Sequence, residues 1–258
     1  MQASVCRKVP IVTQILGVRF SSGNASELVQ LGVLGGLVVV PSAPVLVESQ
    51  ASPTLSQALK EADLAIADSG LMILLWRIFT GERLERVSGL EYLKELLKRE
   101  ELRRPGALFW VMPSAQSRER NISWLRSCGL LSPPESYYVA PIYGYGPLQD
   151  EMLLLNIKRS RPDHIIIALG GGVQERLGLF LRSQFTTMNV PYRPGIHCIG
   201  AAIGFLNGDQ VKIPAWADYL YLGWLCRCFA APRRFVPRYW RALRLISLML
   251  RFREKSPA

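Results

Sequence analysis

The sequence predicts an α/β protein: a parallel sheet flanked by helices, with a C-terminal helical, basic amphipathic appendage. Three observations predict this fold. Short apolar runs bounded by turn residues recur along the chain, segments of helical period separate them, and the last part of the chain is helical only. With 258 residues, 49% hydrophobic and 20% charged, the chain can bury a core, which excludes a disordered or collagenous protein.

Six apolar runs have the length and composition of buried parallel strands. They are Leu37–Val40, Leu64–Ala67, Ala107–Met112, Tyr137–Ile142, His164–Leu169 and His197–Ala202. The segments between them carry apolar residues at helical spacing. The expected helices are Thr54–Ala62, with Thr54 as its cap, then Ser88–Lys98, Ser114–Ser127, Leu148–Lys158 and Gln174–Ser183. Because strands alternate with helices, both faces of the sheet are expected to be covered.

The tail of the chain concentrates the positive charge. The whole chain has a net charge of +11, and from Cys226 onward eight arginines and one lysine face a single acid, a net charge of +8. On a helix running from Arg233, one arc carries Arg234, Arg238, Arg241 and Arg244, and the opposite arc carries Phe235, Val236, Tyr239, Leu243, Ile246 and Leu250. We expect a core over residues 1–212 and an appendage over residues 213–258. The charge predicts a polyanionic partner, and the apolar arc favours an anionic membrane over nucleic acid.

Other features predict few specialised sites. Five cysteines without metal-ligand spacing argue against a disulfide scaffold and a zinc site, and fit a reduced cytosolic setting. We expect neither a secretory signal nor a transmembrane helix, since Pro41 and Pro44 interrupt the longest uncharged stretch. The two histidines, His164 and His197, are interpreted as structural. Four aromatic residues are interpreted as packing or interface residues: Trp216, Tyr219, Tyr221 and Trp224.

Asp68 is the first candidate for chemistry, because ligands of open parallel sheets bind beyond the carboxyl ends of the strands. It follows the expected strand Leu64–Ala67 and precedes Ser69-Gly70 and an apolar helix. A carboxylate here can accept a proton from a substrate hydroxyl. The alternative is a helix cap, which position alone favours.

A glycine turn and a charged loop are the second and third candidates. Gly170-Gly171-Gly172 separates a strand from the helix that opens at Gln174, so its backbone can approach a diphosphate at a helix N-terminus; the alternative is only a tight turn. The loop Glu82–Gly89 contains Arg86, whose planar guanidinium suits phosphate. An ordinary solvated loop with ion pairs is the alternative for that segment.

Together these residues resemble the WecG/TagA/CpsF glycosyltransferases, which make bacterial surface polysaccharides and wall teichoic acid. The matching motifs keep the family's order and compatible spacing over almost the whole chain. They are Ile15-Leu16-Gly17-Val18, Ala58–Leu64 leading to Asp68-Ser69-Gly70, Glu85–Gly89, Ser160-Arg161-Pro162-Asp163, Gly170 with Gln174-Glu175, Phe205-Leu206-Asn207-Gly208, Pro214-Ala215-Trp216 and Pro232-Arg233-Arg234.

The resemblance implies a Rossmann-like core and an inverting, metal-independent transfer of a hexose such as N-acetylmannosamine. The donor is a UDP-sugar, no cofactor is involved, and the acceptor is linked to undecaprenyl diphosphate. The enzyme is expected to be cytoplasmic and peripheral on the inner face of the plasma membrane, with homo-oligomers possible. By motif match Asp68 is the base, and Arg86 and Gln174 are active-site residues. The expected substrate-binding residues are Ser42, Ser69, Gly70, Gly170, Gly171, Gly172, Glu175, Arg233, Arg234 and Arg238.

Four departures from the family pattern alter polar positions. Val40-Pro41-Ser42 stands where the family often reads Thr-Pro-Asn, and Gly204 stands where it often has Asp. Leu220–Trp224 lacks an acid, and Gly172-Val173 replaces Pro-Lys. Since the expected base and arginines remain, these changes predict a shifted donor or acceptor. The alternative is a catalytically inactive relative that acts as a membrane-docked scaffold of a polysaccharide assembly complex.

Overall fold

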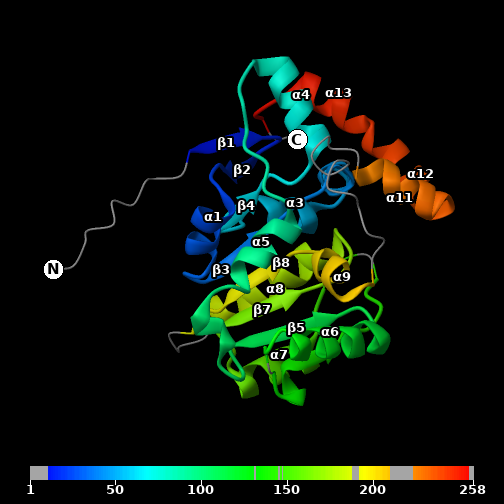
Figure 1. Ribbon diagram of the computed structural model, residues 1–258. Helices are drawn as coiled ribbons and strands as arrows, with labels where there is room; N and C mark the ends of the chain where they lie inside the picture. Colours follow the sequence, from blue (N-terminus) through cyan, green and yellow to red (C-terminus); the bar gives the residue numbers. More distant parts are fainter. Residues whose placement is uncertain are drawn as a thin grey trace.

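A computed structural model describes residues 11–130, 132–144, 146, 148–187, 192–209 and 223–255. Within these residues eight strands form one sheet (Figure 1). The strands are β1 (Val12–Ile15), β2 (Val18–Ser21), β3 (Gly36–Val39), β4 (Leu64–Ile66), β5 (Leu108–Met112), β6 (Tyr137–Val139), β7 (His164–Ile167) and β8 (Gly195–Cys198). Their order is β1-β2-β4-β3-β8-β7-β5-β6, and every pair except β1 with β2 is parallel. The predicted α/β class with a mostly parallel sheet is confirmed.

Helices follow most strands and cover both faces of the sheet. They are α1 (Ala25–Gly32), α2 (Ala43–Glu48), α3 (Pro53–Lys60), α4 (Gly70–Thr80), α5 (Gly89–Leu96), α6 (Ala115–Ser127), α7 (Glu151–Ser160), α8 (Val173–Thr187), α9 (Ala202–Asn207), α11 (Gly223–Ala230), α12 (Pro232–Ala242) and α13 (Arg244–Phe252). Short 3-10 helices lie at Glu100–Arg103 and Pro134–Ser136.

Alternate residues of the strands point into two separate cores. Leu37 and Val39 of β3 pack with the cluster that α2, α3, α4, α7, α8 and α13 cover. Val38, between them, packs with the cluster that α1, α5, α6 and α9 cover. Because successive strand side chains point to opposite faces, the apolar runs bury both faces of the sheet and produce three layers.

Two predicted strands end three or more residues earlier than expected. The prediction of a strand over His197–Ala202 is wrong in its second half, because β8 ends at Cys198, Gly200 adopts φ +60°, and α9 begins at Ala202. β6 ends at Val139 rather than Ile142, next to Pro141, whose nitrogen cannot donate to a ladder. In both places an apolar run continues past the last hydrogen-bonded residue of the strand.

Two helix-cap assignments change. Ser52, rather than Thr54, caps α3: its hydroxyl accepts from the Leu55 amide at 3.4 Å, and Pro53 takes the first helical position. Asp68 is not the cap of α4, since the Ser69 hydroxyl accepts from the Met72 amide at 3.3 Å. The cap interpretation of Asp68 is therefore wrong, and its carboxylate is used elsewhere.

The N-terminal hairpin, α1 and α2 were not among the predicted elements. β1 and β2 are four residues each, and their turn places Leu16 at φ 51° and Gly17 at φ 81°. The α2 segment contains Pro44, which the sequence pattern marks as a break although proline fits the first turn of a helix. Short elements with atypical turn residues leave a weak pattern in the sequence.

The C-terminal segment is helical, as predicted, but the single helix predicted from Arg233 is two helices, α12 and α13, which meet at Leu243. α12 contacts α11 and α2, and α13 contacts α2 and α4. Ala242, Leu245 and Met249 are buried in the same cluster as α2 and α4. The tail therefore packs on the core, while the predicted boundary at residue 212 lies outside the described residues.

Candidate functional site

The carboxyl edge of the sheet has a topological switch point between β3 and β8. The chain leaves β3 for β4 on one side, whereas β8 is reached through β7 on the other side. α2 follows β3 on one face of the sheet and α9 follows β8 on the opposite face. A crevice outside the strand ends is the usual ligand site at such a point. The predicted site residues can be located relative to it.

Asp68 and Arg86 form an ion pair beyond the end of β4. The Arg86 Nη2 atom lies 3.3 Å from the Asp68 Oδ1 atom, and Arg86 Nε donates to the Asp68 carbonyl at 2.9 Å. Their side chains are 30% and 20% exposed, respectively. The Val87 amide donates to the Ala67 carbonyl at 3.1 Å, which fixes the loop against the strand end. The structure thus joins two separately predicted candidates into one partly exposed pair.

Ser42, Ser69 and Gly70 lie near this pair but differ in what they offer. Ser42 occupies the N-cap position of α2, yet its hydroxyl makes no capping bond. Ser69 is buried and its hydroxyl caps α4, while Gly70 is the first residue of that helix. Ser42, beyond the end of the neighbouring strand β3, is therefore better placed to offer a hydroxyl to a ligand than Ser69.

The glycine turn after β7 is closed by the helix that follows it. Gly172 has φ +90°, a conformation that favours glycine, and its amide donates to Glu175 Oε2 at 2.6 Å. The Gln174 amide donates to the Gly170 carbonyl at 3.2 Å. Because the Gly172 and Gln174 amides already have partners, a diphosphate beside the turn needs other donors.

Gln174 and Glu175 are buried and connect this turn to the end of β8. Gln174 Oε1 accepts from the Gly200 amide at 2.6 Å, and Gln174 Nε2 donates to Glu175 Oε1 at 2.9 Å. Complete burial raises the pKa of the Glu175 carboxyl, although the hydrogen bonds from Gln174 and Gly172 oppose this effect. Direct substrate contact by Gln174 stays a prediction; the geometry gives it the additional task of fixing the turn.

Arg176 fixes the next loop, and sequence reasoning did not select it. Its guanidinium is buried and donates to the carbonyls of Gly172, Gly144 and Gly146 at distances from 2.7 to 3.2 Å. Asp150 caps α7 through the Leu153 amide at the far end of the same loop. The sequence offered one indication of this role: Arg176 directly follows the predicted site motif Gln174-Glu175.

The tail arginines reach different places. Arg238 is half-buried, and its Nη2 atom lies 3.5 Å from the position that a Cβ on Gly171 would take. Its guanidinium therefore lies beside the glycine turn. Arg233 is exposed, and the side chain of Arg234 lies outside the described part of the structure. The predicted positions Trp216, Tyr219 and Tyr221 also fall outside the described residues.

A continuous set of contacts links the two halves of the site. β4 and β7 are three strand spacings apart, about 14 Å, so no single reacting group bridges them. Gly89, three residues after Arg86, packs against the Ile199 carbonyl, 3.3 Å from the position of an added Cβ. Gly200 follows Ile199 and binds Gln174. The edge therefore suits an extended ligand with a reacting group near Asp68 and an anionic part near Arg238.

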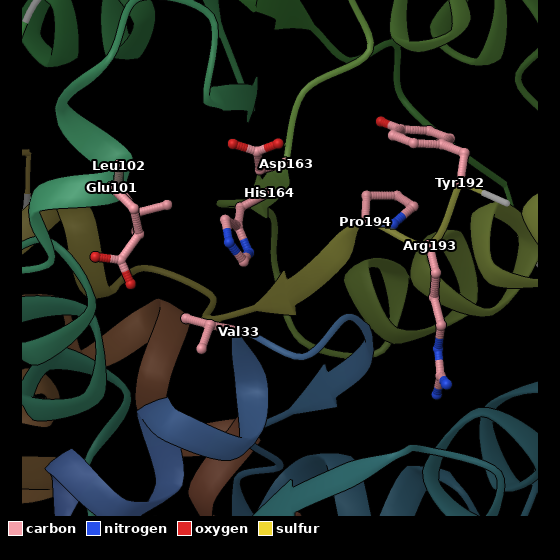
Figure 2. A pocket seen from close by; sticks show the side chains of 8 residues that line it. All are labelled: Val33, Glu101, Leu102, Asp163, His164, Tyr192, Arg193 and Pro194. Atoms are coloured by element: carbon pink, nitrogen blue, oxygen red, sulfur yellow. The ribbon is translucent and has the colours of Figure 1, made fainter. Parts of the chain in front are cut away.

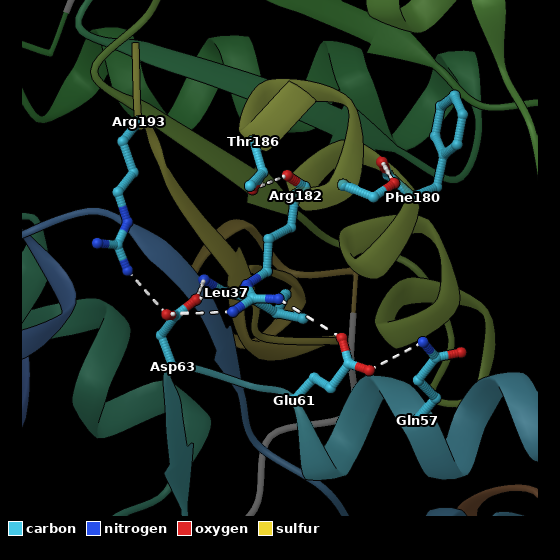
Figure 3. Close-up of polar contacts among 9 residues, drawn as sticks. Leu37, Gln57, Glu61, Asp63, Phe180, Arg182, Thr186 and Arg193 are labelled. Atoms are coloured by element: carbon cyan, nitrogen blue, oxygen red, sulfur yellow. Dashed lines mark hydrogen bonds and ion pairs between the residues drawn. The ribbon is translucent and has the colours of Figure 1, made fainter. Parts of the chain in front are cut away.

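A second cluster lies at the opposite, amino-terminal edge of the sheet (Figure 3). Asp63 precedes β4 and accepts from the Leu37 amide at 2.8 Å, from Arg182 Nε at 2.8 Å and from Arg193 Nη2 at 2.8 Å. Burial alone would raise the pKa of Asp63, but the bonds from Arg182 and Leu37 and the charge of Arg193 hold it below its ordinary value. These contacts join β3, the start of β4, α8 and the segment that leads into β8.

The two histidines also meet at this edge. His164 Nδ1 lies 3.0 Å from His197 Nε2, and His197 Nδ1 lies 3.0 Å from the Tyr92 hydroxyl. Complete burial and the neighbouring His164 hold the pKa of His197 well below its ordinary value. This burial agrees with the interpretation of both histidines as structural. Their contact was not predicted because they are far apart in the sequence.

Two cavities open at the amino-terminal edge rather than at the carboxyl edge. One has a volume of about 330 Å³ and is lined by Glu101, His164 and Arg193 among others (Figure 2). The other, of about 580 Å³, is lined by Arg19, Lys60 and Asp63 among others. Neither includes Asp68, Arg86 or the glycine turn. Within the described ranges no group of three or more His, Cys, Asp or Glu could hold a metal ion.

The fold and the polar carboxyl edge define a class: a doubly wound α/β protein with polar side chains beyond the strand ends at its switch point. The chain belongs to the glycosyl transferase WecG/TagA/CpsF family, whose model matches residues 13–257. It is thus a family glycosyltransferase with a sugar donor and an acceptor as substrates. A comparison with curated proteins finds no significant match. Among the described helices, none has the length and apolar character needed to cross a bilayer.

Proposed function

We propose that this glycosyltransferase moves a hexose from a UDP-sugar to an acceptor sugar on undecaprenyl diphosphate, with inversion at the anomeric carbon. The observation that carries the proposal is the ion pair of Asp68 with Arg86 at the end of β4, on the same edge as Arg238 and the glycine turn. The family assignment supports sugar transfer, and the arrangement of this edge supports the particular roles below.

Asp68 acts as the general base. A sugar hydroxyl is a weak nucleophile at neutral pH, so it must lose its proton as it attacks the anomeric carbon. The Asp68 carboxylate takes this proton while the bond from the anomeric carbon to the UDP oxygen breaks. Arg86 holds Oδ1 of Asp68 in place through its Nη2 atom.

Arginines stabilise the departing diphosphate. Negative charge develops on the UDP oxygen as the donor bond breaks, and guanidinium groups stabilise it by charge-assisted hydrogen bonds. Arg238 lies beside Gly171 of the turn, and Arg233 lies on the same helix. These roles require no metal ion or organic cofactor in the proposed reaction.

The tail brings this site to its lipid-linked acceptor. α12 and α13 carry exposed arginines, and each basic residue near an anionic bilayer contributes about 1 kcal/mol of attraction. Since α12 packs on α2, which begins beside Ser42, membrane contact by the tail holds the carboxyl edge near the bilayer surface. The enzyme would then work as a peripheral protein of the inner membrane face.

A transfer assay tests the proposal directly. Purified protein is incubated with a panel of UDP-hexoses and a synthetic undecaprenyl-diphosphate sugar, and the product is detected by mass spectrometry. We expect turnover with a member of the panel, and its loss in Asp68→Asn. Asp163→Asn is the matched control, because Asp163 also pairs with an arginine, Arg104, but at the amino-terminal edge.

The outcomes distinguish an active glycosyltransferase from a catalytically inactive member of the family. Equal turnover in Asp68→Asn and the wild type would contradict the role of the base. A folded wild-type protein without turnover on any donor would favour the inactive, membrane-docked scaffold instead.

A further inference from the structure

Helix α4 presents an apolar face to solvent although it belongs to the core. Met72, Leu75 and Trp76 are buried, whereas Leu74 is 52% exposed and Ile78 is 64% exposed. These two residues are four apart, so they lie next to each other on one side of the helix. Arg77, also exposed, is adjacent to them. The packing of α4 on the core therefore leaves two large apolar side chains uncovered on one face of the helix.

The tail carries a second apolar surface, which runs along both of its last helices. Its members recur at spacings of three or four residues and are 36% to 74% exposed: Val236, Trp240, Leu243, Ile246 and Leu250. The side that packs on the protein instead carries Ala242, Leu245 and Met249. The tail is therefore apolar on its outer side as well as on its inner side. We call the outer residues the tail stripe.

The two apolar surfaces adjoin. α13 contacts α4, and the two helices lie side by side in Figure 1. Leu245 and Met249 of α13 share a buried cluster with Leu75 and Trp76 of α4, so this contact is an apolar one. The exposed residues Leu74 and Ile78 therefore lie on a helix that directly neighbours the tail.

Exposed arginines flank this area. Arg241, Arg244 and Arg251 project between the tail stripe and the buried side of α12 and α13, and Arg77 adjoins the pair on α4. Acids also stand at the ends of these helices: Glu254 follows α13, and Glu82 follows α4. An apolar face bordered by guanidinium groups matches the acyl region and the anionic headgroups of one bilayer leaflet.

We propose that Leu74 and Ile78 of α4 form, with the tail stripe, one lipid-docking surface for a bilayer with anionic headgroups. The inference extends the proposed function, which assigns membrane contact to the tail alone. In this arrangement the core itself enters the interface, through the helix that starts two residues after Asp68. Docking at two places, rather than by a tethered tail, fixes the orientation of the carboxyl edge relative to the bilayer.

Vesicle flotation with point variants tests this surface. The full chain is mixed with vesicles of phosphatidylglycerol and phosphatidylcholine, or of phosphatidylcholine alone. Leu74→Glu/Ile78→Glu is expected to lower the partition coefficient onto the anionic vesicles by roughly tenfold or more, because two apolar side chains lose their burial and two negative charges face the lipid. Leu74→Ser/Ile78→Ser, which adds no charge, is expected to give a smaller loss. Ile246→Glu/Leu250→Glu should reproduce the large loss.

The matched control is Met152→Glu/Leu155→Glu on α7. These residues are 62% and 59% exposed, and Figure 1 shows α7 at the opposite end of the molecule from α4. This variant should float like the wild type, and circular dichroism should be unchanged in every variant. Flotation requires no turnover, so an inactive enzyme would leave this result intact.

Three results would overturn the proposal. The first is a wild-type protein that does not bind anionic vesicles. The second is flotation of both α4 variants with the anionic vesicles to the same extent as the wild type. The third is a change in oligomeric state on size-exclusion chromatography, with vesicle binding unchanged, which would make this face a contact between copies of the chain.

Discussion

The two ends of β4 carry an aspartate each, and the two residues have different partners. Asp63, before the strand, accepts hydrogen bonds from a backbone amide and two arginines of different elements. Asp68, after the strand, pairs with Arg86 in the loop that follows α4. Both belong to one motif of the family resemblance and are five residues apart. Their surroundings, rather than residue type or motif membership, distinguish the structural carboxylate of Asp63 from the proposed base, Asp68.

Direction along the strand explains this difference. The amino-terminal edge collects residues near the C-terminal ends of α3 and α8, and there Asp63 is held by Leu37 of β3, Arg182 of α8 and Arg193. The carboxyl edge collects loops that enter helices, which is where open sheets bind ligands. The predictions that follow break or sharpen this contrast, beginning with the largest effect.

Asp68→Asn should abolish most transfer activity and leave stability nearly unchanged. Loss of a general base typically costs about 100-fold to 10,000-fold in rate, and we expect kcat to fall within that range. The amide preserves the shape of the side chain and part of its contact with Arg86. Initial rates of transfer and a urea unfolding curve check both halves. A protein that unfolds easily but turns over normally would reverse the assignment of the two aspartates.

Arg86→Lys should lower kcat by roughly 10-fold to 100-fold, since lysine keeps the charge but cannot bind both the carbonyl and the carboxylate of Asp68 as the planar guanidinium does. Steady-state kinetics measure this effect. Arg104→Lys, in the ion pair with Asp163, is the control and should retain wild-type rates.

Asp63→Asn should destabilise the fold by about 2 kcal/mol, because hydrogen bonds to charged groups are lost and two arginines lose their partner. Its kcat should match the wild type. The pKa of Asp63 is lowered in the folded state, so its stabilisation is present above the unfolded pKa and disappears as pH falls through the folded pKa. Urea unfolding from pH 6 down to pH 3 should therefore be less pH-dependent in the variant. A steeper acid dependence in the variant would contradict this sign.

His197→Gln should flatten the decline in stability below pH 6.5. Burial keeps His197 neutral in the folded state, whereas the same histidine binds a proton in the unfolded chain. The free energy of unfolding therefore falls as pH drops, and one histidine contributes at most about 1.4 kcal/mol for each pH unit. Glu175 contributes the opposite sign, since its raised pKa favours the folded state at lower pH. The difference between variant and wild type in urea unfolding at pH 5 and pH 7.5 isolates the histidine.

The strength of the sequence pattern decided which elements of the fold were predictable. Strands such as Leu108–Met112 are buried on both sides and appear as continuous apolar runs. The β1–β2 hairpin was missed because its strands are short and Leu16 occupies a left-handed turn position that asparagine usually takes. A continuous apolar run therefore identifies a buried strand, whereas the four-residue strands of the hairpin contain no such run.

The site was predictable as a set of positions but not as a set of contacts. Polar residues after strands located Asp68 and the glycine turn, since the carboxyl ends of parallel strands share an edge. No sequence spacing shows that Asp68 and Arg86 pair, that Gln174 reaches Gly200, or that Arg238 lies beside Gly171. These contacts depend on strand order and on the packing of the tail, which local patterns do not encode.

Backbone hydrogen bonds between the end of the tail and the N-terminal hairpin determine how the role of the tail in membrane binding can be measured. The Leu16 and Gly17 amides donate to the carbonyls of Arg253 and Glu254, at 2.7 and 3.0 Å, so the end of the described chain is joined to its first hairpin. Deleting the tail would leave these amides unpaired and remove Leu245 and Met249 from beneath α4. Loss of membrane binding by a truncated protein could then result from a destabilised fold. Point substitutions on the outer side of α12 and α13 leave these contacts in place, so they test the role of the tail in membrane localisation more directly.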